Sequence, residues 1–354
     1  MSSSSAAAAP SARIAPLDSL RFVCALIVMF AMTGPPPIGP SLQGLLGDGD
    51  AELAPLFGAV WSAPAAAVVF FIISGVCVHY SAHHAAGRKA ALYSPSFFLK
   101  HYCRVLLPAA ILWALATPFG VDLAAFNQTA LWSVVAVLIY YSLYPALLLM
   151  RWRLPSWRPL IGVSLLLALL IATTAPSAPD YASFGPAIAW LLGLPCWLLG
   201  CHLAEAMSLR PERAAIARPT LWRLRAAVLA AMLAAAALKA QFGVGDPWTL
   251  NAFGVIAAIW IYAEAMGAAA RPAPEWLEKA GTWSYSLFLT GAVTAALIDA
   301  HLGFNTETWP SWALRFGLIL CAAYSFHLLI EAPSHRLARY LGSGVTRRGA
   351  RRPA

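Results

Sequence analysis

The chain has 354 residues, of which 60% are hydrophobic and 11% are charged, and its mean hydropathy is +0.69. Soluble domains carry about 25% charged residues, so this composition excludes an ordinary soluble protein and indicates an integral membrane protein. The net charge is +9. Because the basic residues fall in alternate connections between apolar segments, membrane topology explains them better than nucleic-acid binding does.

Ten apolar segments approach the length of about 20 residues that a membrane-spanning helix needs. We therefore expect an all-α protein with about ten transmembrane helices, at approximately 19–33, 59–80, 105–120, 129–150, 159–176, 185–206, 223–240, 250–270, 282–300 and 312–332. Residues 1–15 are small, polar and low in complexity, so they predict a disordered tail. A cleaved signal peptide is the alternative, although Asp18 and Arg21 interrupt the usual basic-then-apolar order.

The basic residues predict the orientation of the chain in the membrane. One set of connections holds most of them, namely Arg88, Lys89, Lys100, Arg104, Arg151, Arg153, Arg158, Arg210, Arg213, Arg218, Arg223, Arg225, Arg271 and Lys279. The positive-inside rule places this set, and both termini, in the cytoplasm, and an even number of spans agrees. The membrane domain is expected over 16–333. The basic tail, 334–354, is interpreted as a cytoplasmic anchor to anionic lipid.

An acid and a base precede the first apolar run, one helical turn apart. Asp18 and Arg21 are i and i+3 neighbours, so they can pair on one face of a helix that then enters lipid. With the orientation above, Ser74, Arg104 and Glu331 lie at the same cytoplasmic level. Guanidinium groups bind phosphate with two hydrogen bonds, which favours an anionic ligand. Alternatively, the pair is a salt bridge at the headgroup level and each arginine follows the positive-inside rule.

The cysteines indicate neither a disulfide framework nor a metal site. All six lie in or beside apolar segments, and none of their spacings is typical of paired metal ligands. They are interpreted as small buried hydrophobic residues.

Six short motifs follow one another along the chain in the order and spacing of a known family. They are PLDSLRF at 16–22, FFIISGV at 70–76, FFLKHYCRVLLP at 97–108, LWSVVAVLIYYSLYP at 131–145, WSYSLFL at 283–289 and IEAP at 330–333. On these motifs the chain resembles the type-3 membrane acyltransferases (Acyltransferase 3) from about residue 16 to residue 340. The resemblance implies transfer of an acyl group, often acetyl from acetyl-CoA, to a hydroxyl of an envelope carbohydrate or similar acceptor.

The resemblance further implies a cavity, open to the cytosol, that holds acyl-CoA as a co-substrate, and it implies no metal. The positions of this chain that match the lining of that cavity are Asp18, Arg21, Ser74, Arg104, Tyr285, Ser286 and Glu331. Among them, Arg21 is expected either to contact the acyl-CoA or to serve as a structural partner of Asp18.

At the positions where the family carries reactive groups, this chain is apolar. Met32 stands in the first span where the family usually has a histidine, and Val135 and Val137 lie in a stretch where it usually has glutamate. Gly291 stands where the family often has a second histidine. Acyl transfer to a hydroxyl needs a general base, and losing one lowers the rate by about 10²–10⁴. The departures therefore predict an enzyme that is impaired or inactive.

Another histidine could replace the missing base. His79, His202 and His327 are expected near inner ends of spans, and His327 lies four residues before Glu331, a spacing that lets a carboxylate orient an imidazole. Of the other histidines, His83, His84, His101 and His335 are interpreted as interfacial or loop residues, and His301 is placed in an outer loop.

Three functions stay open from the sequence. The first is O-acyl transfer from acyl-CoA, at an impaired rate. The second keeps the same fold as a non-catalytic membrane component, a binding partner or a carrier for a lipid-linked or small substrate. The third, a secondary transporter, is less well supported, because transporters commonly show internal repeats and broken helices and neither is clear here. The expected location is the inner membrane of a bacterium.

Overall fold

The computed structural model describes residues 14–38, 58–84, 95–120, 132–209, 216–267, 272–304 and 308–340. Throughout these ranges the regular structure is helical, without a strand. Most of the predicted N-terminal tail lies outside the described residues, as does the predicted basic tail from residue 341 on. The first part of that predicted tail, 334–340, is helical. The connections at 85–94, 210–215 and 268–271 also lie outside the described residues, and they hold five of the 24 basic residues.

Each of the ten predicted apolar segments contains a helix. The long helices are α1 (Ala15–Thr33), α4 (Ala63–His84), α6 (Pro95–Ala116), α8 (Trp132–Arg153), α9 (Arg158–Thr174), α10 (Ala189–Leu209), α11 (Arg218–Phe242), α12 (Asp246–Gly267), α14 (Ser284–Leu302) and α15 (Trp309–Phe326). Within the described ranges, nine helical segments are long and apolar enough to cross a membrane, and α9, at 17 residues, is shorter. The prediction of an all-α integral membrane protein is confirmed.

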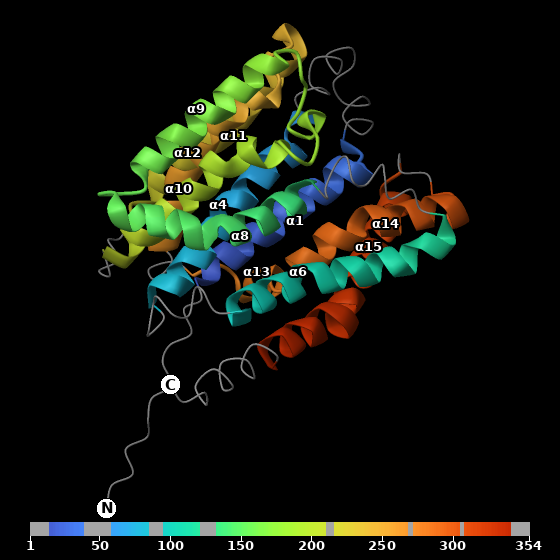
Figure 1. Ribbon diagram of the computed structural model, residues 1–354. Coiled ribbons are helices and arrows are strands. Elements are labelled where there is room, and N and C mark those ends of the chain that lie inside the picture. Colours follow the sequence, from blue (N-terminus) through green and yellow to red (C-terminus); the bar gives the residue numbers. More distant parts are fainter. Residues whose placement is uncertain are drawn as a thin grey trace, which may run out of the picture.

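The helices form a bundle with α4 at its centre. Helix α4 packs against α1, α10 and α12, and α10 in turn contacts α8, α9 and α12. Figure 1 shows α9, α11 and α12 together on one flank of this centre and α6, α14 and α15 on the other. A short helix that the sequence did not predict, α13 (Glu275–Gly281), packs against α1.

The crossing of α4 and α10 depends on two glycines that bring the backbones together. A Cβ atom at Gly75 of α4 would lie 2.1 Å from the carbonyl oxygen of Trp197, and one at Gly200 of α10 would lie 2.1 Å from that of Ile72. Both neighbours are backbone atoms, which cannot rotate away. Small residues allow such close approach between membrane helices, where van der Waals packing drives association. The crossing fixes α4 as the wall on which the site is built.

Two helices extend further than the sequence predicted. Helix α6 begins at Pro95 rather than near residue 105, so Arg104 lies inside the helix and not ahead of it. The chain after α15 continues as a π-helical turn, His327–Glu331 (η5), and remains helical to Tyr340. π-helical turns are rare and often occur at functional sites.

Charged side chains near the helix ends are paired across the bundle. Arg315 is 5% exposed, its Nη2 lies 2.7 Å from Oδ2 of Asp299, and it also donates to the carbonyl oxygen of Thr33 at the end of α1. Nε of Arg225 lies 2.8 Å from Oε1 of Glu264. Unpaired charges are costly at membrane depth, so these contacts hold neighbouring helices together.

We predict that Gly200→Ala destabilises the bundle. The added methyl group meets the carbonyl oxygen of Ile72, so α4 and α10 must separate, and overpacking of this kind costs about 1–3 kcal/mol. The free energy of unfolding, measured by titration of the purified protein with SDS, should fall by that amount. Gly162→Ala on α9 is the control, because no atom of the described residues lies within 4 Å of its Cβ position. Equal stability of the two variants would contradict the close crossing.

Candidate functional site

A cavity of about 650 Å³ lies between α1, α4, α6, α8, α14 and the helical chain from η5 to Arg339. Its polar residues gather toward the end of the bundle at which α1 begins and α4 and α8 end, which we call the basic end. The positive-inside rule predicts that this end faces the cytoplasm.

At the basic end, α1 contributes the pair that the sequence singled out. Nη1 of Arg21 donates to Oδ1 of Asp18 at 3.1 Å, and its Nη2 lies 3.0 Å from Sγ of Cys77 on α4. Asp18 is 8% exposed, and α13 closes over it through Gly281. The guanidinium group is therefore held in place by two partners while it still lines the cavity.

The wall formed by α4 and α8 carries a chain of hydroxyl groups. Oγ of Ser74 lies 3.2 Å from the hydroxyl of Tyr141 and accepts a hydrogen bond from Nε1 of Trp197 at 3.3 Å. Opposite, the Tyr285 hydroxyl of α14 donates to the carbonyl oxygen of Val105 at 2.7 Å, which ties α14 to α6. These bonds fix the orientation of the aromatic rings around the cavity.

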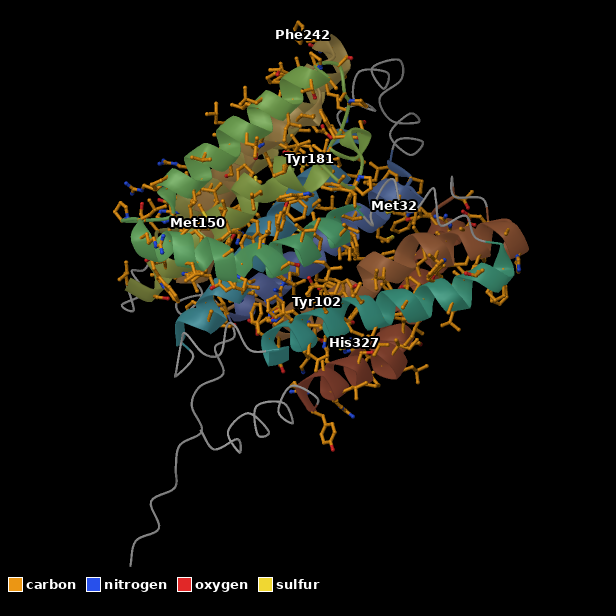
Figure 2. The ribbon with its side chains drawn as sticks, viewed as in Figure 1. Met32, Tyr102, Met150, Tyr181, Phe242 and His327 are labelled. Atoms are coloured by element: carbon orange, nitrogen blue, oxygen red, sulfur yellow. The ribbon has the colours of Figure 1, made fainter. Side chains whose placement is uncertain are left out.

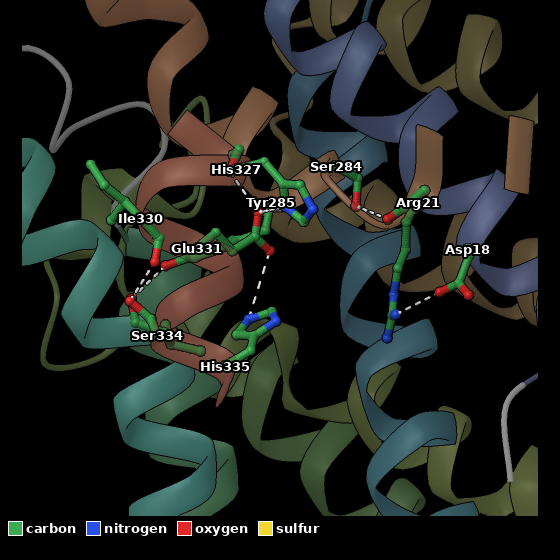
Figure 3. A network of polar contacts seen from close by, with 12 residues as sticks. Asp18, Arg21, Ser284, Tyr285, His327, Ile330, Glu331, Ser334 and His335 are labelled. Atoms are coloured by element: carbon green, nitrogen blue, oxygen red, sulfur yellow. Dashed lines mark hydrogen bonds and ion pairs between the residues drawn. The ribbon is translucent and has the colours of Figure 1, made fainter. Parts of the chain in front are cut away.

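A buried carboxylate organises the third wall. Glu331 is 1% exposed, and its Oε2 accepts a hydrogen bond from Oγ of Ser286 at 2.6 Å and lies 2.8 Å from Nδ1 of His327. Its Oε1 lies 3.7 Å from Nε2 of His335, one turn further along the helix. Figure 3 shows the two imidazoles on either side of this carboxylate, with the Asp18–Arg21 pair across the site.

Three further arginines face the cavity from α6 and from the helix after η5. They are Arg104, Arg336 and Arg339. All three are exposed, and among the described residues none of them forms an ion pair with a carboxylate. Of the acidic groups on the lining, Asp18 pairs with Arg21 and Glu331 lies between the two imidazoles. The mouth of the cavity thus carries uncompensated positive charge.

The structure brings together most of the residues predicted to bind acyl-CoA. Those that line the cavity are Asp18, Arg21, Ser74, Arg104, Tyr285 and Glu331. Ser286 is fully buried behind them and acts on the cavity only through Glu331. The convergence that the topology predicted is therefore observed, although the role of these residues in binding stays a prediction.

Of the positions where a base was expected, only one reaches the cavity. Val137 lines it, whereas Val135 lies on the exposed face of α8. Gly291 packs against Met29, whose Cγ would lie 3.0 Å from a Cβ there. Met32 stands near the far end of α1, well apart from His327 (Figure 2). Met32 and Gly291 thus stand outside the cavity lining.

Among the candidate substitute bases, the structure separates His327 from the others. His327 lines the cavity with a carboxylate behind it. His79 is buried and its Nδ1 lies 2.9 Å from the Tyr144 hydroxyl, and neither His79 nor His202 belongs to the lining.

Sequence reasoning missed several cavity residues. Cys77 was interpreted as a buried hydrophobe, yet its sulfur contacts Arg21 at the cavity wall. His101 and His335 were interpreted as interfacial or loop residues, yet both lie in helices and line the cavity. The spacing of His335, four residues after Glu331, was a signal that could have found it.

Comparison of the chain with family models, curated proteins and solved structures finds no match. The resemblance to the type-3 acyltransferases therefore stays a prediction that rests on the six sequence motifs alone.

We predict that Ser286→Ala destabilises the protein through Glu331. A hydrogen bond to a buried charged group contributes about 1.5–3 kcal/mol, so the free energy of unfolding should fall by that amount. Ser284→Ala is the control on the same helix. Its buried hydroxyl donates to the neutral carbonyl oxygen of Gly281 at 2.9 Å, so its loss should cost about 0.5–1.5 kcal/mol. If both variants lose the same stability in an SDS titration, the charge-assisted bond is not what holds α14 to η5.

Proposed function

We propose that the protein binds an acyl-CoA in the basic-end cavity and transfers its acyl group to a hydroxyl of an envelope carbohydrate or similar acceptor. The observation that carries the proposal is one cavity that combines a carboxylate-oriented imidazole on its wall with arginines at its mouth that have no carboxylate partner among the described residues. The inner membrane of a bacterium is the location that fits this reaction and the resemblance.

The charge of the cavity supports an anionic ligand with phosphate groups. Arg104, Arg336 and Arg339 have no carboxylate partner among the described residues, and each presents a guanidinium fork that matches phosphate oxygens. Arg21 adds a fourth cation whose position Asp18 fixes. The phosphates of CoA are ligands of this chemistry, and they would enter at the end of the bundle that is predicted to face the cytosol.

The geometry of His327 supports proton transfer. Its Nδ1 lies 2.8 Å from Glu331, which holds the ring and leaves Nε2 for a substrate. In the proposed step, Nε2 accepts the proton of the acceptor hydroxyl while the oxygen of that hydroxyl attacks the thioester carbonyl carbon. The carbon–sulfur bond breaks, and the CoA sulfur leaves and takes up the proton. His327 thus replaces the base that Met32, Val137 and Gly291 do not supply.

A second candidate, the non-catalytic binding partner or carrier, is favoured by one observation. Val137, which stands where the resemblance places a glutamate, lines the cavity without a group that could hold a proton. A carrier needs the same cationic mouth and does not need His327. The two candidates therefore differ in turnover and not in binding.

We predict that Arg104→Gln weakens the binding of CoA by about tenfold or more, because a charge-assisted contact contributes about 1.5–3 kcal/mol. Equilibrium binding of CoA to the purified protein in nanodiscs measures the change. Arg158→Gln removes the same charge from an exposed position at the start of α9, away from the cavity, and should leave the dissociation constant unchanged. Equal loss in the two variants would point to a general surface-charge effect.

We predict that His327→Ala lowers the release of CoA thiol from acyl-CoA by about 10²–10⁴-fold in membranes that contain an acceptor, since a general base contributes about that factor. Met32→His should not raise the rate, because residue 32 lies outside the cavity lining.

Two results of this thiol-release assay would count against the assignment. A rise with Met32→His would place the chemistry at the far end of α1. Binding of acyl-CoA without any acceptor-dependent release would favour the carrier.

A further inference from the structure

The cavity changes character along its length. It follows α4 from Ser81 to Phe70, and the 11 steps between these residues span about 16 Å at 1.5 Å per residue. The half nearest the basic end contains the charged and imidazole groups. The other half, which we call the deep end, is lined by Phe70, Phe71, Ser133, Val134, Val137 and Phe288. Among the described lining residues, no charged side chain belongs to the deep end.

The walls of the deep end are firmly packed against the core. Phe71 is 1% exposed and makes edge contacts with the rings of Trp132 and Tyr140, at 5.7 Å and 5.5 Å between centroids. Phe70 meets Phe288 in the same way, at 6.0 Å. Aromatic rings held by several neighbours do not swing aside at small cost. The apolar walls are therefore present before any ligand arrives.

We propose that the deep end binds the hydrocarbon chain of a fatty acyl group longer than acetyl. This inference rests on the proposed function, because it assigns the acyl part of the same ligand. The phosphates of the CoA would lie against the arginines of the mouth, and the thioester would lie between the two halves, beside His327. The chain would extend along α4 and α8 toward Phe70 and Val134.

The continuity of the two halves is what selects this ligand. One uninterrupted space with cations at one end and aromatic and aliphatic walls at the other fits a molecule that is anionic at one end and apolar at the other. An acetyl group has one methyl carbon and would leave the deep end unfilled. A carbohydrate acceptor needs hydrogen-bonding partners, and Ser133 is the sole polar side chain among the deep-end residues named above.

The test compares dissociation constants of CoA, acetyl-CoA and octanoyl-CoA for the full chain in nanodiscs. Each methylene group moved from water to an apolar site improves affinity by up to about fourfold. We expect octanoyl-CoA to bind at least about tenfold more tightly than acetyl-CoA, and acetyl-CoA to bind about as tightly as CoA.

Substitutions at Val137 locate the chain. Val137→Phe fills the deep end and should remove the preference for octanoyl-CoA while CoA still binds. Val163→Phe makes the same change on the exposed face of α9 and should keep the preference. Val137→Thr preserves the volume of the side chain and adds a hydroxyl, so it should reduce the preference even if the larger phenylalanine prevents folding.

The outcomes separate the two proposals. Equal affinity for acetyl-CoA and octanoyl-CoA, with CoA still bound, would overturn the inference and leave the proposed function standing. A preference that survives both Val137→Phe and Val137→Thr would place the chain elsewhere and would overturn it as well. Failure of all three ligands to bind would reject the proposed function and the inference with it.

Discussion

The site depends on one buried carboxylate. Glu331 is almost completely inaccessible, and a charge at such depth is tolerated only when it is paired and hydrogen-bonded. Ser286 and His327 meet this requirement, and the bond from Ser286 also joins α14 to the π-helical turn after α15. The same contacts turn an imidazole toward the cavity. The contacts that stabilise the buried carboxylate are thus the same contacts that orient the candidate catalytic imidazole.

A second constraint determines what the cavity can hold. The glycine crossing of α4 and α10 fixes the wall from which Ser74 and Cys77 face the basic end and Phe70 and Phe71 face the deep end. Arginines from α6 and from the helix after η5 complete the mouth. The polar mouth and the apolar interior of the cavity together explain why we assign an amphipathic, phosphate-bearing ligand to a space between membrane helices.

The sequence predicted the helices and most of the polar lining because apolar length and the positions of charges are local properties. It placed Arg104 outside a helix, since the polar residues of the first turns of α6 hide the true start at Pro95. It also could not tell which histidines face the cavity. The spacing of His327 and Glu331 indicated that the two side chains could pair. Which way that pair faces depends on packing partners far away in the chain, as does the contact of His79 with Tyr144.

The accessibility of Cys77 tests the central claim most directly. Its sulfur lies against Arg21 in the cavity, and of the other cysteines only Cys103 and Cys321 are not buried. With those two changed to serine, alkylation by N-ethylmaleimide reports on Cys77. If acyl-CoA occupies the cavity, octanoyl-CoA should slow this alkylation at concentrations near its dissociation constant. CoA should also slow it, but only at higher concentrations. An alkylation rate that saturating octanoyl-CoA leaves unchanged would contradict the account.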